Sequence, residues 1–194
     1  MRRQDGSVKF RNKLWYAYKF GFGNLDGEFW LGNEARHILT ESDSYRVRFD
    51  LVTFDRRWGH AEYSKFDIGP ESDQYQLVIG GYSGNLTVLL PRHSASINTT
   101  MKFSTKDRFN DDNLAEVCFT TNTHDQSENM IKFSTKDRDN DKLEGACCCG
   151  GWWFNACGYV RLTGDYDGVG YEGITWYPFD GNLAYADMKI RLNG

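Results

Sequence analysis

Apolar and polar residues alternate along three stretches of the chain. The clearest is Tyr45–Leu51 (YRVRFDL); Tyr75–Asn85 (YQLVIGGYSGN) shows the same period before a glycine turn, and Asp187–Asn193 (DMKIRLN) repeats it near the C-terminus. A period of two is typical of strands that bury one face. The pattern therefore predicts an antiparallel sheet with a half-buried surface.

One stretch has helical spacing instead. In Asn33–Ser42 (NEARHILTES), Ala35, Ile38 and Leu39 fall on one side of a helix, and Asn33 is placed to cap its N-terminus. Together with the strands, this predicts an α+β fold. Glycine-rich, aromatic loops dominate the C-terminal third, where we expect the recognition site.

The alternation breaks down at about residues 86–130, and an internal near-repeat lies there. Lys102–Arg108 is identical to Lys132–Arg138, but the first copy then has Phe109 where the second has Asp139. A thirty-residue period can indicate a repeat architecture. Because only two copies occur, we predict a local duplication inserted into a single domain that spans residues 1–194.

Composition narrows the classes of partner. The net charge of −4 gives no electrostatic reason to expect nucleic acid or an anionic membrane, and no apolar run approaches the length of a bilayer span. The four histidines are scattered outside any catalytic motif, so we expect no enzyme activity. An odd number of cysteines, five, leaves at least one thiol free or paired with another protein molecule.

An acidic segment precedes three consecutive cysteines. Asp137, Asp139 and Asp141 alternate on a turn-forming stretch that leads into Cys147–Cys149. Adjacent cysteines cannot easily converge on one tetrahedral zinc ion, whereas calcium takes carboxylate and carbonyl oxygens. The segment lacks the glycine and glutamate of an EF-hand loop. From spacing alone, a calcium site and a solvated charged turn both stay open.

Longer motifs now add to this interpretation. The segments DGSVKF, GFGNLDGEFWLGNE, YQLVIGGYSGN, MIKFSTKDRDND, GGWWFNAC and GITW occur in this order. They resemble the fibrinogen C-terminal (fibrinogen-related) domain, a family that includes ficolins, tachylectins, angiopoietins and tenascins. The likeness runs from Gln4 to Leu192, apart from the inserted stretch. It implies a central antiparallel sheet, short helices and a loop-rich C-terminal part that binds calcium and ligand.

The resemblance also implies site residues. The family's calcium carboxylates fall on Asp139 and Asp141, and its carbonyl ligands fall on Leu143 and Gly145. Its C-terminal disulfide would join Cys157 to a cysteine of the CCC run; Cys147 is the first choice, and Cys148 and Cys149 remain alternatives. The remaining residues match the family's ligand pocket: Ala156, Cys157, Gly158, Tyr159 and Tyr171.

The sequence departs from the family at the pocket. Gly158 stands where lectin members often have histidine, and the stretch between the paired cysteines is about three residues shorter than usual. The family also has a further segment ahead of Arg2, so we expect an N-terminally truncated domain. Other aromatic residues that could face a ligand or the core are Trp152, Trp153, Tyr166 and Trp176, with Trp152 and Trp153 favoured for the core.

We therefore expect a secreted, calcium-dependent, lectin-like domain that binds acetylated carbohydrates or similar surface ligands, in innate recognition. The altered pocket keeps two alternatives open: a domain that binds a receptor or matrix protein, and a degenerate truncated paralogue. The resemblance leaves room for a homo-oligomer in a full-length form. Two sequons, Asn85-Leu86-Thr87 and Asn98-Thr99-Thr100, would accept glycans in an extracellular protein.

Overall fold

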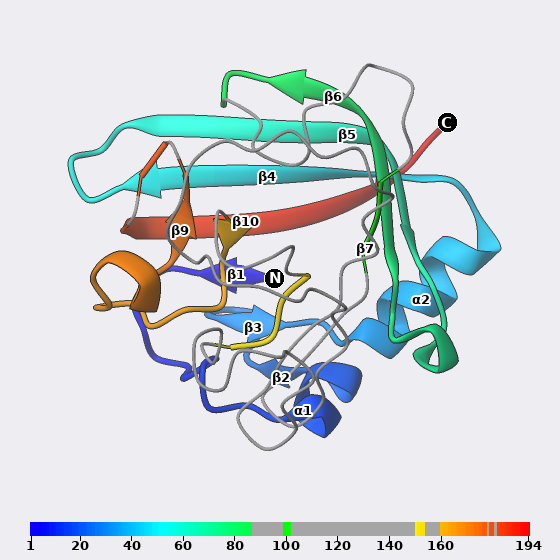
Figure 1. Cartoon of the computed structure of the whole chain (residues 1–194), viewed down its shortest axis with the longest axis horizontal. Coiled ribbons are helices and arrows are strands. Elements are labelled where there is room, and N and C mark those ends of the chain that lie inside the picture. Colours follow the sequence, from blue (N-terminus) through cyan, green and yellow to red (C-terminus); the bar gives the residue numbers. More distant parts are fainter. Residues whose placement is uncertain (87–98, 102–149, 154–159, 178, 181) are drawn as a thin grey trace, which may run out of the picture.

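A long twisted sheet forms the body of the molecule (Figure 1). The computed structural model describes residues 1–86, 99–101, 150–153, 160–177, 179–180 and 182–194. Within them the eight-stranded order is β2-β3-β1-β10-β4-β5-β6-β7. The strands are β1 (Arg2–Arg3), β2 (Phe22–Gly23), β3 (Phe29–Trp30), β4 (Tyr45–Thr53), β5 (Trp58–Ile68), β6 (Leu77–Gly84), β7 (Thr99–Met101) and β10 (Leu183–Leu192).

The central strands follow directly from the alternation in sequence. In β4, Val47, Phe49 and Leu51 are buried while the residues between them lie on the outer face. Phe49 pairs with Met188 of β10 on one side and with Ala61 of β5 on the other, so all three strands bury the same face. The α+β class with a central antiparallel sheet is confirmed.

Short elements complete the fold. Helix α1 (Trp15–Phe20) lies beside β2, and helix α2 (Asn33–Ser42) packs against β5 and α1 (Figure 1). A second, two-stranded sheet pairs β8 (Val160–Arg161) with β9 (Thr175–Trp176). Single 3-10 turns occur at η1 (Glu71–Asp73) and η2 (Gly170–Glu172). None of the described helices is long and apolar enough to cross a bilayer.

Helix α2 has the predicted bounds, but its predicted buried face is wrong. Ile38 and Leu39 are exposed, whereas Arg36 and Thr40 are buried. Thr40 is buried because its hydroxyl accepts a hydrogen bond from the Ile68 backbone N–H at 3.1 Å. Asn33 is the first helical residue, and Gly32 occupies the cap position without a side-chain hydrogen bond. The apolar residues of this helix therefore do not mark its contact with the sheet.

Aromatic side chains dominate the core. Trp152 and Trp153 are buried against Trp30, with ring centroids 6.3 and 6.1 Å from it. Trp153 also donates its indole N–H to the Tyr75 backbone oxygen at 2.9 Å. The prediction that this pair lies in the core is thus confirmed, and the pair ties the segment that follows Cys149 to the main sheet.

Candidate ligand-binding surface

Most of the predicted site lies outside the described residues. This applies to the calcium ligands Asp139, Asp141, Leu143 and Gly145, to the disulfide Cys147–Cys157, and to the pocket residues Ala156, Gly158 and Tyr159. Tyr171 belongs to η2, although its side chain is not described. The structure therefore shows the flank of the predicted pocket: strands β8 and β9 and the loop between them.

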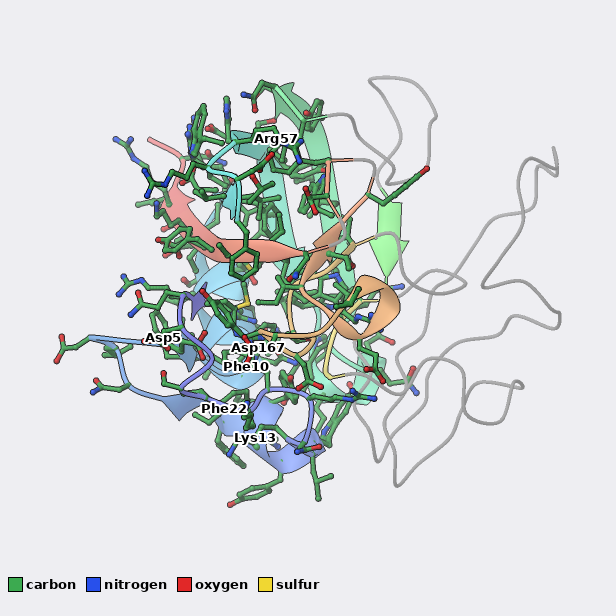
Figure 2. The ribbon with its side chains drawn as sticks, turned by 90° about the vertical axis from the view of Figure 1, so that its left-hand side faces the viewer. Asp5, Phe10, Lys13, Phe22, Arg57 and Asp167 are labelled. Carbon is green, nitrogen blue, oxygen red and sulfur yellow. The ribbon has the colours of Figure 1, made fainter. Side chains whose placement is uncertain are left out.

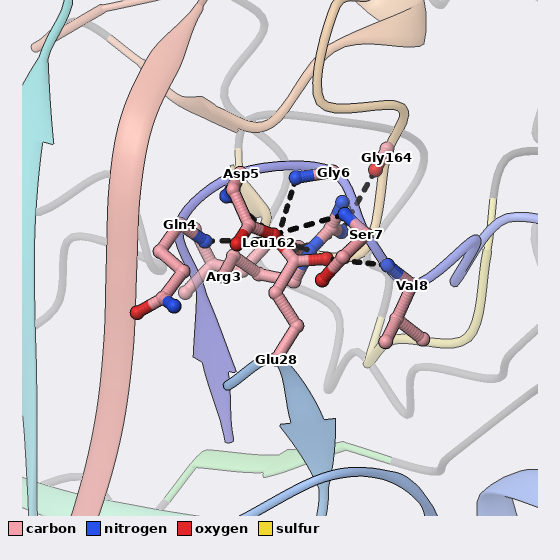
Figure 3. A network of polar contacts seen from close by, with 9 residues as sticks. All are labelled: Arg3, Gln4, Asp5, Gly6, Ser7, Val8, Glu28, Leu162 and Gly164. Atoms are coloured by element: carbon pink, nitrogen blue, oxygen red, sulfur yellow. Dashed lines mark hydrogen bonds and ion pairs between the residues drawn. The ribbon is translucent and has the colours of Figure 1, made fainter. Parts of the chain in front are cut away.

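The start of this loop is held by one buried arginine. Arg3 of β1 donates from Nη1 to the backbone oxygens of Leu162, at 3.3 Å, and Gly164, at 2.9 Å. Its Nε donates to the Glu28 carboxylate at 3.3 Å, and both side chains are essentially inaccessible to solvent. Burial lowers the pKa of Arg3, an effect that Glu28 opposes. The pair connects the N-terminal strand to the β8–β9 loop (Figure 3).

Glu28 also gathers the backbone of the loop after β1. Its Oε1 accepts N–H hydrogen bonds from Gln4 at 2.8 Å and Gly6 at 3.1 Å, and its Oε2 accepts one from Val8 at 2.9 Å. Burial alone would raise the pKa of Glu28, but these amides and the Arg3 charge outweigh it and hold the pKa below its ordinary value. Glu28 is therefore an ionised internal anchor.

A second arginine holds the other end of the β8–β9 loop. Arg11 forms ion pairs with Asp165 at 2.8 Å and Glu172 at 3.3 Å, both partly open to solvent. The loop also closes on itself, because the Asp165 N–H donates to the Glu172 backbone oxygen at 2.7 Å. A Cβ at Gly164 would come within 2.1 Å of the Gly173 oxygen, so only glycine fits at this crossing.

The anchored loop presents acidic and apolar groups to solvent. Asp167, Val169, Glu172 and Tyr177 are exposed, and Tyr166 is half-buried beside the loop that contains Asp5. Burial and the nearby carboxylates of Asp167 and Asp5 raise the pKa of Tyr166. Asp5 and Asp167 both face the viewer in Figure 2. We give the name loop surface to four exposed residues, three in this loop and one directly after β9: Asp167, Val169, Glu172 and Tyr177.

Sequence reasoning missed the scaffold of this surface. In the sequence, Arg2 and Arg3 form a pair too short for a basic patch. No sequence motif connects Arg3 with Glu28, which lies 25 residues away. Of the aromatic candidates with described side chains, Tyr166 lies next to the loop surface, whereas Trp176 is buried. Among the described residues, no cluster of three or more His, Cys, Asp or Glu side chains could hold a metal ion.

Comparison with known proteins identifies the family. The sequence profile of the C-terminal globular domain of the fibrinogen beta and gamma chains matches residues 1–125 and 116–193. The protein belongs to this family. The resemblance seen in the sequence motifs is thereby confirmed, and so is the fibrinogen-like form of the fold.

Curated relatives are longer than this protein. Bovine angiopoietin-4 is 33% identical over 100% of the sequence and 34% of its own length. Human fibrinogen-like protein 1 is 36% identical over 99% of this protein and 58% of its own length. Ryncolin-4 of Cerberus rynchops is 35% identical over 98% of this protein and 48% of its own length. The 194 residues thus span between about one third and three fifths of these relatives.

Solved structures agree with the fold. The fibrinogen-like globe domain of human ANGPTL2 superposes with a TM-score of 0.72 at 33% identity, covering 100% of this protein and 78% of that domain. A lamprey fibrin D-dimer, complexed with the peptide ligand Gly-His-Arg-Pro-amide, superposes with a TM-score of 0.67 at 31% identity. The match covers 100% of this protein and 62% of the lamprey protein. Fibrinogen-like domains of this kind are recognition domains.

Proposed function

We propose that this protein is an extracellular recognition domain that binds a polypeptide ligand carrying basic side chains at the loop surface. The observation that carries the proposal is the combination of a firmly anchored loop with exposed carboxylates. Arg3 and Arg11 fix the two ends of the loop. Asp167 is exposed, and Glu172, the partner of Arg11, still has most of its side chain in solvent. Preorganised acidic groups attract and orient a cationic partner at little conformational cost.

The peptide bound by the lamprey relative supports this choice of ligand class, because it contains an arginine. Binding of basic peptides, including Gly-His-Arg-Pro-amide, can be measured by calorimetry at two salt concentrations. We expect Asp167→Asn to weaken binding about tenfold, equivalent to about 1.4 kcal/mol, and added salt to weaken it further. Glu62→Gln, which removes one charge from the outer sheet face, is the control. Binding that is insensitive to both Asp167→Asn and salt would contradict the proposal.

The proposal includes a calcium ion bound in the segment ahead of Cys147. The family resemblance assigns calcium to the carboxylates of Asp139 and Asp141 and the backbone oxygens of Leu143 and Gly145, which would supply only oxygen donors, the chemistry that Ca²⁺ prefers. Bound there, the ion would neutralise the repulsion between the two aspartates and order the segment that leads to Cys147. Calorimetric calcium uptake should be abolished in Asp139→Ala. It should persist in Asp107→Ala, which alters the first copy of the repeat.

A second candidate ligand is an acetylated carbohydrate, as in lectin-like members of the family. It is favoured by Tyr177 of the loop surface, which is 55% exposed, because aromatic faces give apolar contact to acetyl and C–H groups. A glycan array probed with and without a calcium chelator tests it. Chelator-sensitive binding that is lost in Tyr177→Ala, with basic peptides inactive, would replace the polypeptide by a sugar.

A further inference from the structure

The first sequon lies where strand β6 ends. Asn85 is exposed, and the residue that follows it, Leu86, is buried. Asparagine followed by any residue except proline and then by threonine is the acceptor signal for N-linked glycosylation. The attachment point is therefore a surface side chain at the border of the sheet.

Two hydrogen bonds join Asn85 to His60, and a third joins Leu86 to the same residue. The Asn85 Oδ1 accepts a hydrogen bond from the His60 backbone N–H at 2.7 Å. The backbone N–H groups of Asn85 and Leu86 both donate to the His60 oxygen, at 3.1 and 3.3 Å. These contacts leave Nδ2, the atom that carries a glycan, without a hydrogen-bond partner among the described residues. A sugar on Nδ2 would preserve every one of them.

The end of β6 next to Asn85 is an open, uncharged edge within the described part of the structure. β7 pairs with β6 only at Leu77, Val78 and Ile79, so Gly80–Gly84 is paired on its β5 side alone. Gly81–Gly84 is exposed and reads GYSG, without lysine, proline or any charge. Soluble proteins protect such edges, because unpaired strand edges join with those of other molecules.

We propose that Asn85 carries an N-linked oligosaccharide and that this sugar shields the open end of β6. The proposal rests on the extracellular route of the proposed function, where a lipid-pyrophosphate oligosaccharide donor is available. A bond forms between Nδ2 and C1 of the first sugar, and the bond from C1 to the pyrophosphate oxygen breaks. Nδ2 loses one proton, and the lipid pyrophosphate leaves with the bonding electron pair.

The second sequon is less suited to this role. Its residues Thr99 and Thr100 are part of β7 and pair with Ile79 and Val78 of β6. This sequon therefore runs into a paired strand, whereas Asn85 lies beyond the last paired residue of its own strand. We expect the glycan at Asn85 whether or not the second sequon is used.

The modification can be tested on the 194-residue protein, secreted from animal cells behind a supplied leader and fused to a known acceptor tag. Peptide N-glycosidase in heavy-oxygen water converts glycosylated asparagine into labelled aspartate, which mass spectrometry locates. We expect label at Asn85 in the parent protein and in Thr100→Ala, and its loss in Thr87→Ala. A labelled tag with unlabelled Asn85 overturns the proposal. Because the leader and tag are supplied, this result does not depend on ligand or calcium binding.

The shielding role has its own measurement. Thr87→Ala removes the sugar but keeps the Asn85 contacts to His60, so light scattering after gel filtration should show more self-association than in the parent. Ser83→Lys, opposite Glu62 on β5, places a charge on the same edge and should return self-association to the level of the parent in the Thr87→Ala background. Equal self-association of the parent and Thr87→Ala would refute the shielding.

Discussion

Glu28→Gln is the sharpest perturbation of the scaffold, because it removes one charge and keeps the shape. The remaining amide oxygen can stay with Gln4, Gly6 and the Arg3 Nε. The new NH₂ group then faces the Val8 N–H, which now donates to Oε2 at 2.9 Å. Two donors would meet at this point, and Arg3 would lose the carboxylate that pairs with it in the interior.

The expected cost follows from these two losses. Breaking a buried ion pair by neutralising one partner costs about 3–5 kcal/mol, and that range includes the effect of an unsatisfied buried N–H, itself about 1–3 kcal/mol. In a protein of 194 residues this corresponds to a fall in Tm of about 6–20 °C. The loss is a large part of the total stability of a domain, about 5–15 kcal/mol.

Urea titration and thermal melting of the parent, Glu28→Gln and Glu62→Gln measure this cost. Glu62 pairs with Arg46 and Arg48 on the outer sheet face, so its neutralisation should cost only about 0.2–1 kcal/mol. Because the pKa of Glu28 lies below its unfolded value of 4.5, its contribution is present above that pH and is lost as the pH falls through the folded pKa. The gap between the parent and Glu28→Gln should therefore shrink in acid. A Glu28→Gln effect no larger than that of Glu62→Gln would refute the anchor.

Two further outcomes are expected. Gly151→Ala should lower the free energy of unfolding by about 1–3 kcal/mol, because its Cβ would lie 2.6 Å from the Tyr18 ring. Gly27→Ala, whose Cβ would meet no close neighbour, is the control, and thermal melts of the two variants measure the difference. Arg36→Met should be neutral or stabilising, because it removes a buried charge that no carboxylate among the described residues pairs with and keeps apolar contact with Trp30; a clear drop in Tm would contradict this.

The strands were predictable because a sheet with one buried face needs a period of two. β4 follows the alternation in sequence, and β6 follows it over its first half. β10 begins earlier than predicted, at Leu183, and its register shifts between Leu183 and Tyr185. The helix was predictable in extent but not in orientation. Arg36 is buried because its guanidinium stacks 3.7 Å from the Trp30 ring centroid, a contact that depends on the tertiary fold and not on helical spacing.

The scaffold of the loop surface was not predictable from sequence, because its bonds join distant segments and largely involve backbone atoms. Arg3 reaches Leu162 and Gly164 across more than 150 residues, and both acceptors are backbone oxygens that any residue type could supply. Glu28 is bound mainly by amide N–H groups, which likewise leave no trace in residue types. The calcium, disulfide and remaining pocket residues stay predictions of the family resemblance.

Two buried arginines in this fold illustrate why burial alone does not reveal a role. Arg3 has a carboxylate partner and two backbone acceptors, so its charge is compensated and its geometry is fixed by bonds in three directions. Arg36 donates to the Asn33 amide oxygen at 3.3 Å, and no carboxylate among the described residues pairs with it. Burial consequently lowers the pKa of Arg36 to about 9. The desolvation cost of Arg3 is thus offset by bonds that also fix the position of the loop. The desolvation cost of Arg36 is offset mainly by stacking on Trp30, a contact that a methionine could reproduce. The two sites should therefore respond with opposite sign to loss of charge.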